Sequence, residues 1–352
     1  MELNAHQQFS QIDTENMLHH IDGLPEQLIF AYQLGMNLDL PKMEPVNTIV
    51  VAGMGGSAIG ADLLAAYTMD QLRVPFIVHR DYGLPAFAIG RDKLVVVSSH
   101  SGNTEEALSA YQAALERGCQ VVVVTTGGSL AEAAEQAGTP VLRFEHTGQP
   151  RAAVGFSFGL LLALLSRLGL IAEASAEVEE THAVLTALKS RIQADVPLMQ
   201  NPAKRQAGQF VGRHVMIFAG SLLAPVARRW KTQFNEVAKT FAVYEPLPEA
   251  NHNTLAGIYN PPEHVRHAYG MFLAAGQEHP RNRLRLQRTR ELFMLEGIAT
   301  DFFNAKGKSR MSQMWSALLF GDYVAYYLAI LYDMDPTSIP PITALKEAMA
   351  GE

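Results

Sequence analysis

A cluster of hydroxyl side chains marks the point where an apolar run ends and a helical pattern begins. Residues 94–108 read Leu-Val-Val-Val-Ser-Ser-His-Ser-Gly-Asn-Thr-Glu-Glu-Ala-Leu, so Ser99, Ser101 and Thr104 stand within six residues. The first N–H groups of a helix lack intrahelical partners and lie at the positive end of its dipole, so nearby hydroxyls can cradle a dianionic phosphate. The loop contains no Lys or Arg, which favours a small phosphate over a nucleotide triphosphate. Thr104 followed by Glu106 is also ordinary capping chemistry, so a capped helix without a ligand is the alternative.

A glycine-rich turn follows an earlier apolar run. It reads Gly53-Met-Gly55-Gly56-Ser57 and lacks the last glycine of the dinucleotide motif G-x-G-x-x-G. Asp81 also matches poorly the acidic residue that should follow this motif, so NAD binding is disfavoured. Close approach of Gly55 and Gly56 to a sugar, with Ser57 donating a hydrogen bond, explains the glycines equally well.

Short β-branched runs alternate with helical patterns in two stretches of the chain. In the first stretch, strands are predicted at 48–52, 75–79, 94–98, 120–125 and 140–143, with helices near 25–38, 58–68, 104–117 and 130–136. After a helical connector, strands are predicted at 214–219, 240–244, 268–274 and 297–302. This alternation indicates parallel βαβ units with helices on both faces of each sheet, and ligands bind such sheets at the carboxyl ends of the strands.

The predicted fold is therefore α/β, with two tandem domains and C-terminal helices. We expect an N-terminal helical segment (1–45), a first domain with the phosphate loop (46–170), a helical connector (171–200) and a second domain (201–352). The phrase Val-Ala-Gly-Met-Gly-Gly-Ser in the first half is echoed by Phe-Ala-Gly-Ser in the second, which indicates an internal duplication. Only the first half contains the hydroxyl loop, so one phosphate site is expected.

Composition narrows the class of protein. A net charge of −7 over 352 residues argues against a general nucleic-acid surface, and a single cysteine, Cys119, excludes an intrachain disulfide or a cysteine zinc site. The apolar segments 152–170 and 311–332 contain polar interruptions and are predicted to be buried helices rather than membrane spans. The N-terminus has no secretory pattern, so we expect a cytoplasmic protein.

Taken together, the motifs resemble the sugar isomerase (SIS) domain family. More specifically, they resemble the two-domain bifunctional phosphoglucose/phosphomannose isomerases of archaea and some bacteria. The matching segments follow the family's order along almost the whole chain: Gly53–Ser57, Ser99–Glu106, Pro150-Arg151, Asn235-Glu236, Asn251-His252-Asn253 and Leu345-Lys346. His100 stands where relatives usually have Tyr, and Thr254 stands where an acidic residue is expected. We expect the His100 side chain to point away from the phosphate.

Aldose–ketose isomerisation needs a base that moves a proton between C1 and C2 of an open-chain sugar phosphate. A carboxylate suits this role when burial lifts its pKa toward neutrality, and the resemblance assigns it to Glu236. From the pattern alone, Glu236 is equally well a solvated residue paired with Lys239 or Thr240. Glu249 is a rival base, although its position after Pro248 favours a structural role.

The resemblance also assigns roles to three further side chains. It implies that His252 and Lys346 open the sugar ring and that Arg151 stabilises the enediolate. In relatives the histidine reaches the active site of the opposite subunit, which implies a homodimer with shared active sites. Without the resemblance, His252 and Lys346 are surface residues, and Arg151 forms an ion pair with Glu145.

The resulting hypothesis is a cofactor-free isomerase that interconverts glucose 6-phosphate, and also mannose 6-phosphate, with fructose 6-phosphate. Phosphate and sugar would be bound by Gly55, Gly56, Ser57, Ser99, Ser101 and Thr104. No metal-ligand motif occurs, and neither a nucleic acid nor a membrane is expected as a partner. The first alternative is a non-catalytic SIS protein that binds a sugar phosphate and regulates. The second is an aminosugar isomerase, which normally carries an N-terminal cysteine glutaminase.

Overall fold

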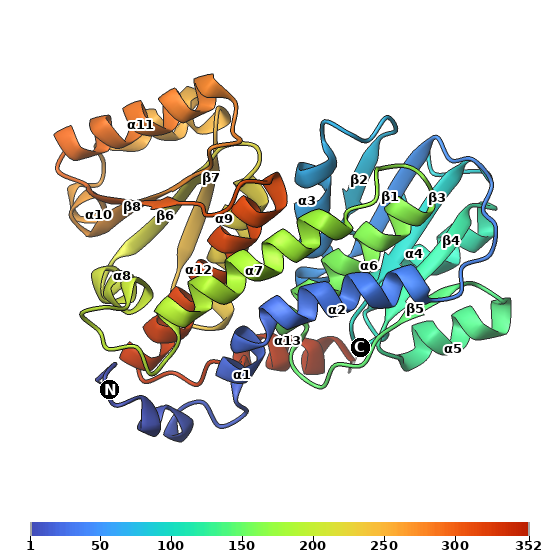
Figure 1. Cartoon of the computed structure of the whole chain (residues 1–352), viewed down its shortest axis with the longest axis horizontal. Coiled ribbons are helices and arrows are strands. Elements are labelled where there is room, and N and C mark those ends of the chain that lie inside the picture. The colour runs from blue at the N-terminus through green and yellow to red at the C-terminus, as the bar shows by residue number, and fades with distance from the viewer. Residues whose placement is uncertain (1, 351–352) are drawn as a thin grey trace. The chain divides into compact units, whose positions relative to one another are not determined.

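The computed structural model describes residues 2–350 and divides into two compact units (Figure 1). The first-sheet unit comprises Gly23–Thr186 and Gly307–Trp315, and the second-sheet unit comprises Met1–Asp22, Ala187–Lys306 and Ser316–Glu352. These units differ from the predicted linear domains in three places, one of which is the predicted connector 171–200, which divides after Thr186. The N-terminal helical segment divides after Asp22, and residues 307–315 belong with the first sheet, because packing follows spatial contacts rather than chain order.

The first sheet has five parallel strands in the order β2-β1-β3-β4-β5, which confirms the α/β prediction for this half. The strands are β1 (Thr48–Gly53), β2 (Phe76–His79), β3 (Lys93–Ser98), β4 (Gln120–Thr125) and β5 (Val141–Arg143). The helices are α2 (Leu24–Asn37), α3 (Gly55–Thr68), α4 (Glu105–Glu116), α5 (Gly128–Ala137), η2 (Pro150–Ala152) and α6 (Val154–Arg167). Each strand agrees with its prediction to within one residue at either end.

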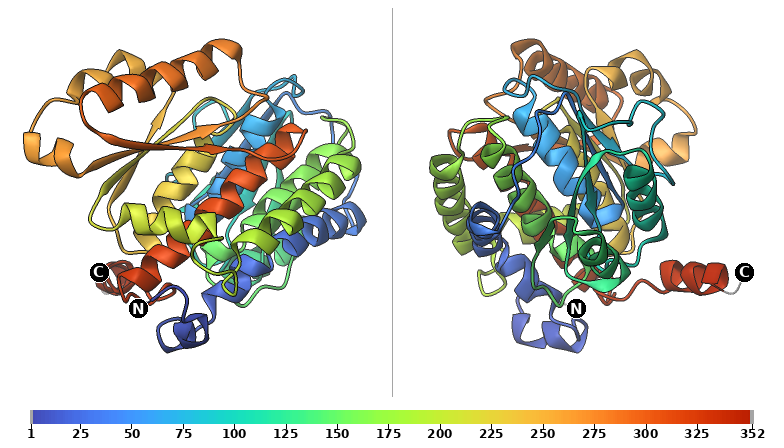
Figure 2. Two further views of the ribbon diagram at one scale, coloured as in Figure 1. Left: turned by 60° about the vertical axis from the view of Figure 1, so that its left-hand side comes forward. Right: turned by 90° about the vertical axis from the view of Figure 1, so that its right-hand side faces the viewer.

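Helices cover the first sheet closely because its strands are apolar on both faces. Val97 of β3 packs with Tyr111 of α4 and Leu130 of α5 in one core. A Cβ atom on Gly60 of α3 would lie 2.3 Å from Ser157 Oγ of α6, so glycine permits the close approach of these helices. α6 also packs along α2, as both views in Figure 2 show.

The second sheet has four parallel strands in the order β7-β6-β8-β9. They are β6 (His214–Ala219), β7 (Ala242–Pro246), β8 (Ala268–Ala274) and β9 (Ala299–Asn304). The helices are α8 (Pro202–Phe210), α9 (Ala224–Glu236), η3 (Glu249–His252), η4 (Thr254–Gly257), α10 (Pro262–His267) and α11 (Pro280–Leu295). β7 starts two residues later than predicted because Thr240 belongs to the turn after α9, where its N–H donates to the Phe234 carbonyl at 3.0 Å.

The remaining helices are η1 (His6–Gln11), α1 (Met17–Asp22), α7 (Ser175–Ile192), α12 (Arg310–Leu331) and α13 (Pro340–Ala350). α12 has the length and hydropathy that a membrane span needs, but 94% of its most apolar window is buried within the structure. α6 is likewise almost entirely buried. Both apolar segments are therefore core helices, as predicted.

Candidate active site

The two loops predicted to bind substrate leave the same edge of the first sheet. β1 and β3 pair in parallel, and Gly53 lies opposite Ser98 at their carboxyl ends. The glycine-rich turn opens into α3, and the hydroxyl loop 99–104 opens into α4. The amino ends of two helices, with their free N–H groups, therefore face this edge.

Ser99 is buried and forms hydrogen bonds within the hydroxyl loop. The residue is only 2% exposed, and its hydroxyl donates to Thr104 Oγ1 at 3.1 Å and accepts the Gly102 N–H at 3.1 Å. Gly102 has a φ of +70°, and a Cβ atom there would lie 1.8 Å from the Gly127 carbonyl oxygen, so only glycine fits. The predicted phosphate ligand Ser99 thus has both of its hydrogen-bonding functions engaged within the loop.

Three other hydroxyls at this edge act only as acceptors among the described residues. Ser57 Oγ accepts the His100 N–H at 3.1 Å, and Ser101 Oγ accepts the Asn103 N–H at 3.2 Å. Thr104 occupies the N-cap position of α4, but its hydroxyl makes no capping bond and only accepts from Ser99. Each of the three keeps an O–H group to donate, which is what a bound anion requires.

Arg151 lies beside the glycine-rich turn. It belongs to η2 and is only 4% exposed. A Cβ atom on Gly56 would lie 2.4 Å from the Pro150 carbonyl oxygen and 2.9 Å from the Arg151 nitrogen, so the glycine permits this contact. The structure therefore places a buried cation next to the amino end of α3.

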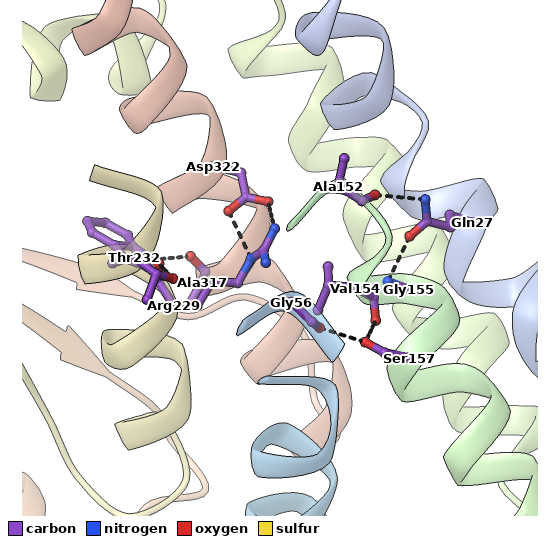
Figure 3. A network of polar contacts seen from close by, with 11 residues as sticks. Gln27, Gly56, Ala152, Val154, Gly155, Ser157, Arg229, Thr232, Ala317 and Asp322 are labelled. Atoms are coloured by element: carbon purple, nitrogen blue, oxygen red, sulfur yellow. Dashed lines mark hydrogen bonds and ion pairs between the residues drawn. The ribbon is translucent and has the colours of Figure 1, made fainter. Parts of the chain in front are cut away.

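A set of polar contacts holds the segment that carries Arg151 (Figure 3). Ser157 Oγ donates to the Gly56 carbonyl at 3.2 Å. Gln27 Nε2 donates to the Ala152 carbonyl at 3.0 Å, and Gln27 Oε1 accepts the Gly155 N–H at 2.7 Å. α2 and α6 thus fix the segment from both sides.

The His100 ring packs away from the hydroxyl groups of the loop. Its Nε2 lies 2.9 Å from His146 Nδ1, and its ring stands edge-on to Phe144 with centroids 5.9 Å apart. Burial lowers the pKa of His100. The ring therefore ties the hydroxyl loop to the chain segment that leads to Arg151.

Glu236 is the last residue of α9 and is half-buried. Arg229 of α9 donates from Nε and Nη2 to the two carboxylate oxygens of Asp322 in α12, at 3.1 and 2.6 Å (Figure 3). Trp230 Nε1 donates to the Ala317 carbonyl at 2.9 Å. Burial raises the pKa of Asp322, and the Arg229 guanidinium acts against this rise. These buried contacts fix α9, and with it the position of Glu236, relative to α12.

His252 is exposed in η3, and its neighbours anchor the loop around it. Asn251 Nδ2 donates to Thr289 Oγ1 at 2.7 Å, and Asn253 Nδ2 donates to Glu249 Oε1 at 2.6 Å. Glu249 therefore has a structural partner, which agrees with the role that its turn position favours.

Thr254 departs from the family pattern but has an acidic partner. Its hydroxyl donates to Glu245 Oε2 at 2.5 Å, and its N–H donates to Asn253 Oδ1 at 2.6 Å. A carboxylate from β7 thus supplies the acidic group that is absent at position 254.

Glu236 and His252 lie at opposite edges of the second sheet. α9 connects the parallel strands β6 and β7 and so runs antiparallel to them. Arg228 Cζ lies 5.9 Å from the centroid of the Tyr244 ring, which places this part of α9 beside the middle of β7. Eight further helical residues, about 12 Å, lead to Glu236 at the amino edge. β7 runs in the other direction, through Pro246 to His252, so the second-sheet unit does not bring these two side chains together.

Lys346 lies on α13, a helix whose described side chains are all exposed. Figure 2 shows α13 standing apart from the rest of its unit. Ile342, Leu345 and Met349 of this helix are 41%, 60% and 50% exposed. Residues at these spacings share one face of a helix, so α13 presents an uncovered apolar face.

The predicted residues therefore fall into two groups. One edge of the first-sheet unit gathers Gly55, Gly56, Ser57, Ser99, Ser101, Thr104 and Arg151. The second-sheet unit carries Glu236, His252 and Lys346 at separate places. Sequence reasoning missed the supporting residues Gln27, Ser157 and Asp322, whose partners lie 93 to 128 residues away along the chain.

Two family models match the chain. The SIS domain model matches residues 42–143, and the model described as the bacterial phospho-glucose isomerase C-terminal SIS domain matches residues 199–349. A glucose-6-phosphate isomerase-like protein from Thermus thermophilus has the same fold, with a TM-score of 0.64 and 19% identity over 96% of this chain and 98% of that one. Fold and matches together define a tandem SIS-domain protein.

Curated relatives identify the family within this class. A bifunctional phosphoglucose/phosphomannose isomerase of Caldicellulosiruptor bescii is 40% identical over 95% of this chain and 99% of its own length. One from Aquifex aeolicus is 30% identical over 87% of this chain and 92% of its own length. The chain belongs to the bifunctional phosphoglucose/phosphomannose isomerase family.

Proposed function

We propose that this protein interconverts glucose 6-phosphate and mannose 6-phosphate with fructose 6-phosphate in the cytoplasm, without a cofactor. The observation that carries the proposal is the set of unused O–H donors at the carboxyl edge of the first sheet, in a chain of this family. Such donors, with the amino end of a helix, suit a dianionic phosphate.

Ser57, Ser101 and Thr104 donate to the phosphate oxygens, and Ser99 holds Thr104 in place from behind. Gly55 has a φ of +49°, and no atom of the described residues lies within 4 Å of its Cβ position, so its backbone is open to the sugar. The same edge carries Arg151, whose fixed charge suits the negative oxygen of an enediolate.

Glu236 performs the proton transfer. Its carboxylate removes the proton from C2 of the open-chain aldose and the C1–C2 enediol(ate) forms. A proton then passes from O2 to O1 while the same carboxylate returns the carbon-bound proton to C1, which gives the ketose. The half-buried end of a helix that is anchored by an ion pair suits a base that must keep its position.

His252 and Lys346 open the ring by removing the proton from the C1 hydroxyl and delivering one to the ring oxygen. The opposite positions of Glu236 and His252 on the second sheet favour a homodimer in which His252 serves the partner's site. The uncovered apolar face of α13, with Leu345 60% exposed, also suits contact with a second copy.

A coupled assay tests the activity. Fructose 6-phosphate is supplied in the presence of EDTA, and glucose and mannose 6-phosphates are measured separately. We expect both products to form. A protein that binds fructose 6-phosphate but forms neither product would instead be the non-catalytic regulatory SIS protein.

Mixing two inactive variants tests the shared site. Glu236→Gln and His252→Ala subunits are each inactive alone, but a mixed dimer of shared sites contains one site with both native side chains. Random exchange of subunits should restore about one quarter of the wild-type activity. Sites contained within one subunit would restore none, which would overturn the shared-site arrangement.

A further inference from the structure

The second-sheet unit contains a cavity of about 710 Å³ that no predicted site residue lines. Its walls come from the end of α7, from α8, from β9 and from Phe320 of α12. β9 is the last strand of its sheet, so one of its edges pairs with no described strand. In the first sheet, β5 occupies the corresponding edge of β4. The cavity therefore lies beside an open strand edge and has the volume of a typical small-molecule site.

Positive charge surrounds this cavity. Arg191, Arg205 and Lys306 line it and are exposed, and within residues 2–350 none of the three forms an ion pair. The lining includes one carboxylate, Asp301, whose Oδ1 accepts the Phe302 N–H at 2.7 Å. In a chain with a net charge of −7, this excess of cations favours an anionic ligand.

The inner wall of the cavity is aromatic. Tyr269, Phe303 and Phe320 line it and are 5%, 7% and 5% exposed. Phe303 and Phe320 stack on each other with ring centroids 4.4 Å apart. Inorganic phosphate or a sugar phosphate would engage the cations but would leave this wall unused. A planar apolar group on the ligand makes use of both features.

A buried donor also lies in the wall. Gln206 is 6% exposed and its amide lies beside the Tyr269 hydroxyl, with which it interacts. An amide nitrogen carries two N–H groups, so the Gln206 amide at this cavity wall keeps a donor for an incoming acceptor. The free edge of β9 adds backbone N–H and C=O groups, which match the donor and acceptor pattern of a nucleobase edge.

We propose that this cavity binds a nucleoside phosphate, with the base against the aromatic wall and the edge of β9 and the phosphates against Arg191, Arg205 and Lys306. Arginine suits phosphate because its planar group donates two parallel hydrogen bonds. The proposed isomerase residues take no part in this site, so it stands independently of the proposed function.

Calorimetric titration of the full-length protein with AMP, adenosine and inorganic phosphate tests the proposal. AMP binding at this cavity is the part of the signal that Arg205→Ala weakens and Thr104→Val leaves unchanged. Thr104 serves as the comparison because it belongs to the other proposed anion site. We expect saturable AMP binding at this cavity, weakened about tenfold or more by Arg205→Ala and by Lys306→Ala. Arg288→Ala, which changes an exposed arginine of α11, should leave AMP binding unchanged.

Three results would overturn the proposal. Wild-type protein that shows no saturable AMP binding at millimolar concentration would exclude the site. Inorganic phosphate that binds as tightly as AMP would indicate a simple anion patch. A shift of the monomer–dimer equilibrium by Arg205→Ala in sedimentation, without ligand binding, would make this edge a protein interface. Because the substituted cations are exposed, thermal melts of the variants should match wild type.

Discussion

The carboxyl edges of the two sheets differ in the side chains that lie at the amino ends of the adjoining helices. On the first sheet, three hydroxyls keep O–H groups to donate. On the second sheet, the Glu278 carboxylate fills the corresponding loop: Oε2 accepts the Leu222 N–H at 3.1 Å, and Oε1 accepts the His279 N–H at 2.9 Å. A Cβ atom on Gly220 would lie 2.3 Å from Glu278 Oε2, so the carboxylate occupies space against the backbone. The first sheet thus keeps O–H donors unengaged at this edge. On the second sheet the Glu278 carboxylate accepts from the N–H donors instead.

One ion pair from each unit shows a second contrast, because the two pairs differ in burial. The first-sheet unit has an exposed ion pair between Arg143 and Glu135, with side chains 51% and 59% exposed. The second-sheet unit buries the pair of Arg229 and Asp322, with side chains 2% and 3% exposed. The helix that carries Glu236 is therefore held by a buried ion pair, whereas the Arg143–Glu135 pair of the first-sheet unit is exposed to solvent.

The largest expected effect is on the buried ion pair. Asp322→Ala leaves the Arg229 charge buried without its partner and should lower the free energy of unfolding by about 3–5 kcal/mol. Glu135→Ala, which breaks the exposed pair, should cost about 0–1 kcal/mol. Urea unfolding of both variants measures the contrast, and equal losses would remove this difference between the units.

Substitution of the proposed base should separate catalysis from binding. Glu236→Gln keeps the size of the side chain but not its basicity, so kcat should fall by about 100-fold or more while KM for fructose 6-phosphate changes little. Glu116→Gln, at the end of α4, is the matched control. Near-normal turnover of the Glu236 variant would refute its role as the base.

Substitution in the hydroxyl loop should instead affect KM more than kcat. Thr104→Val removes one O–H donor at constant shape, and the loss of a hydrogen bond to a charged group, about 1.5–3 kcal/mol, should raise KM about tenfold or more. The control Thr186→Val changes an exposed threonine of α7 whose hydroxyl donates to the His182 carbonyl. An unchanged KM in the Thr104 variant would contradict the assignment of this loop to phosphate.

Removing the Glu278 carboxylate tests the contacts at the carboxyl edge of the second sheet. Glu278→Ala frees the Leu222 N–H near the amino end of α9 and should lower stability by about 1 kcal/mol in urea unfolding. Glu278→Gln keeps an acceptor oxygen and should lose less. If both variants match wild type, the carboxylate does not serve these donors.

The smallest expected effect is a pH dependence from His100. Burial lowers the pKa of His100 below its ordinary value of 6.5, so the unfolded chain binds the proton more readily than the folded chain. The free energy of unfolding should therefore fall as pH drops from about 6.5 toward the folded pKa and then level off. His100→Phe should reduce this dependence relative to His267→Phe, an exposed control, when unfolding is followed between pH 7.5 and about 5. An undiminished pH dependence in the His100 variant would assign it to other groups.

Much of the fold could be read from local patterns. The β-branched runs at 94–98 and 120–125 are too short and too apolar for surface helices, and glycines or prolines bound them, so strand positions followed directly. The later start of β7 could not be read, because the turn at Thr240 is set by a hydrogen bond to Phe234 inside α9.

The hydroxyl loop, the alternation of strands and helices and the apolar character of α6 and α12 follow from neighbouring residues, because short-range backbone preferences and periodicity act within a few positions. Folding in three dimensions decided which described hydroxyls keep a free O–H and that Asp322 contacts Arg229. It also placed Glu236 and His252 at opposite edges of the second sheet. Those outcomes join residues far apart in the chain, and only the pairing of strands and the packing of helices brings such residues together or holds them apart.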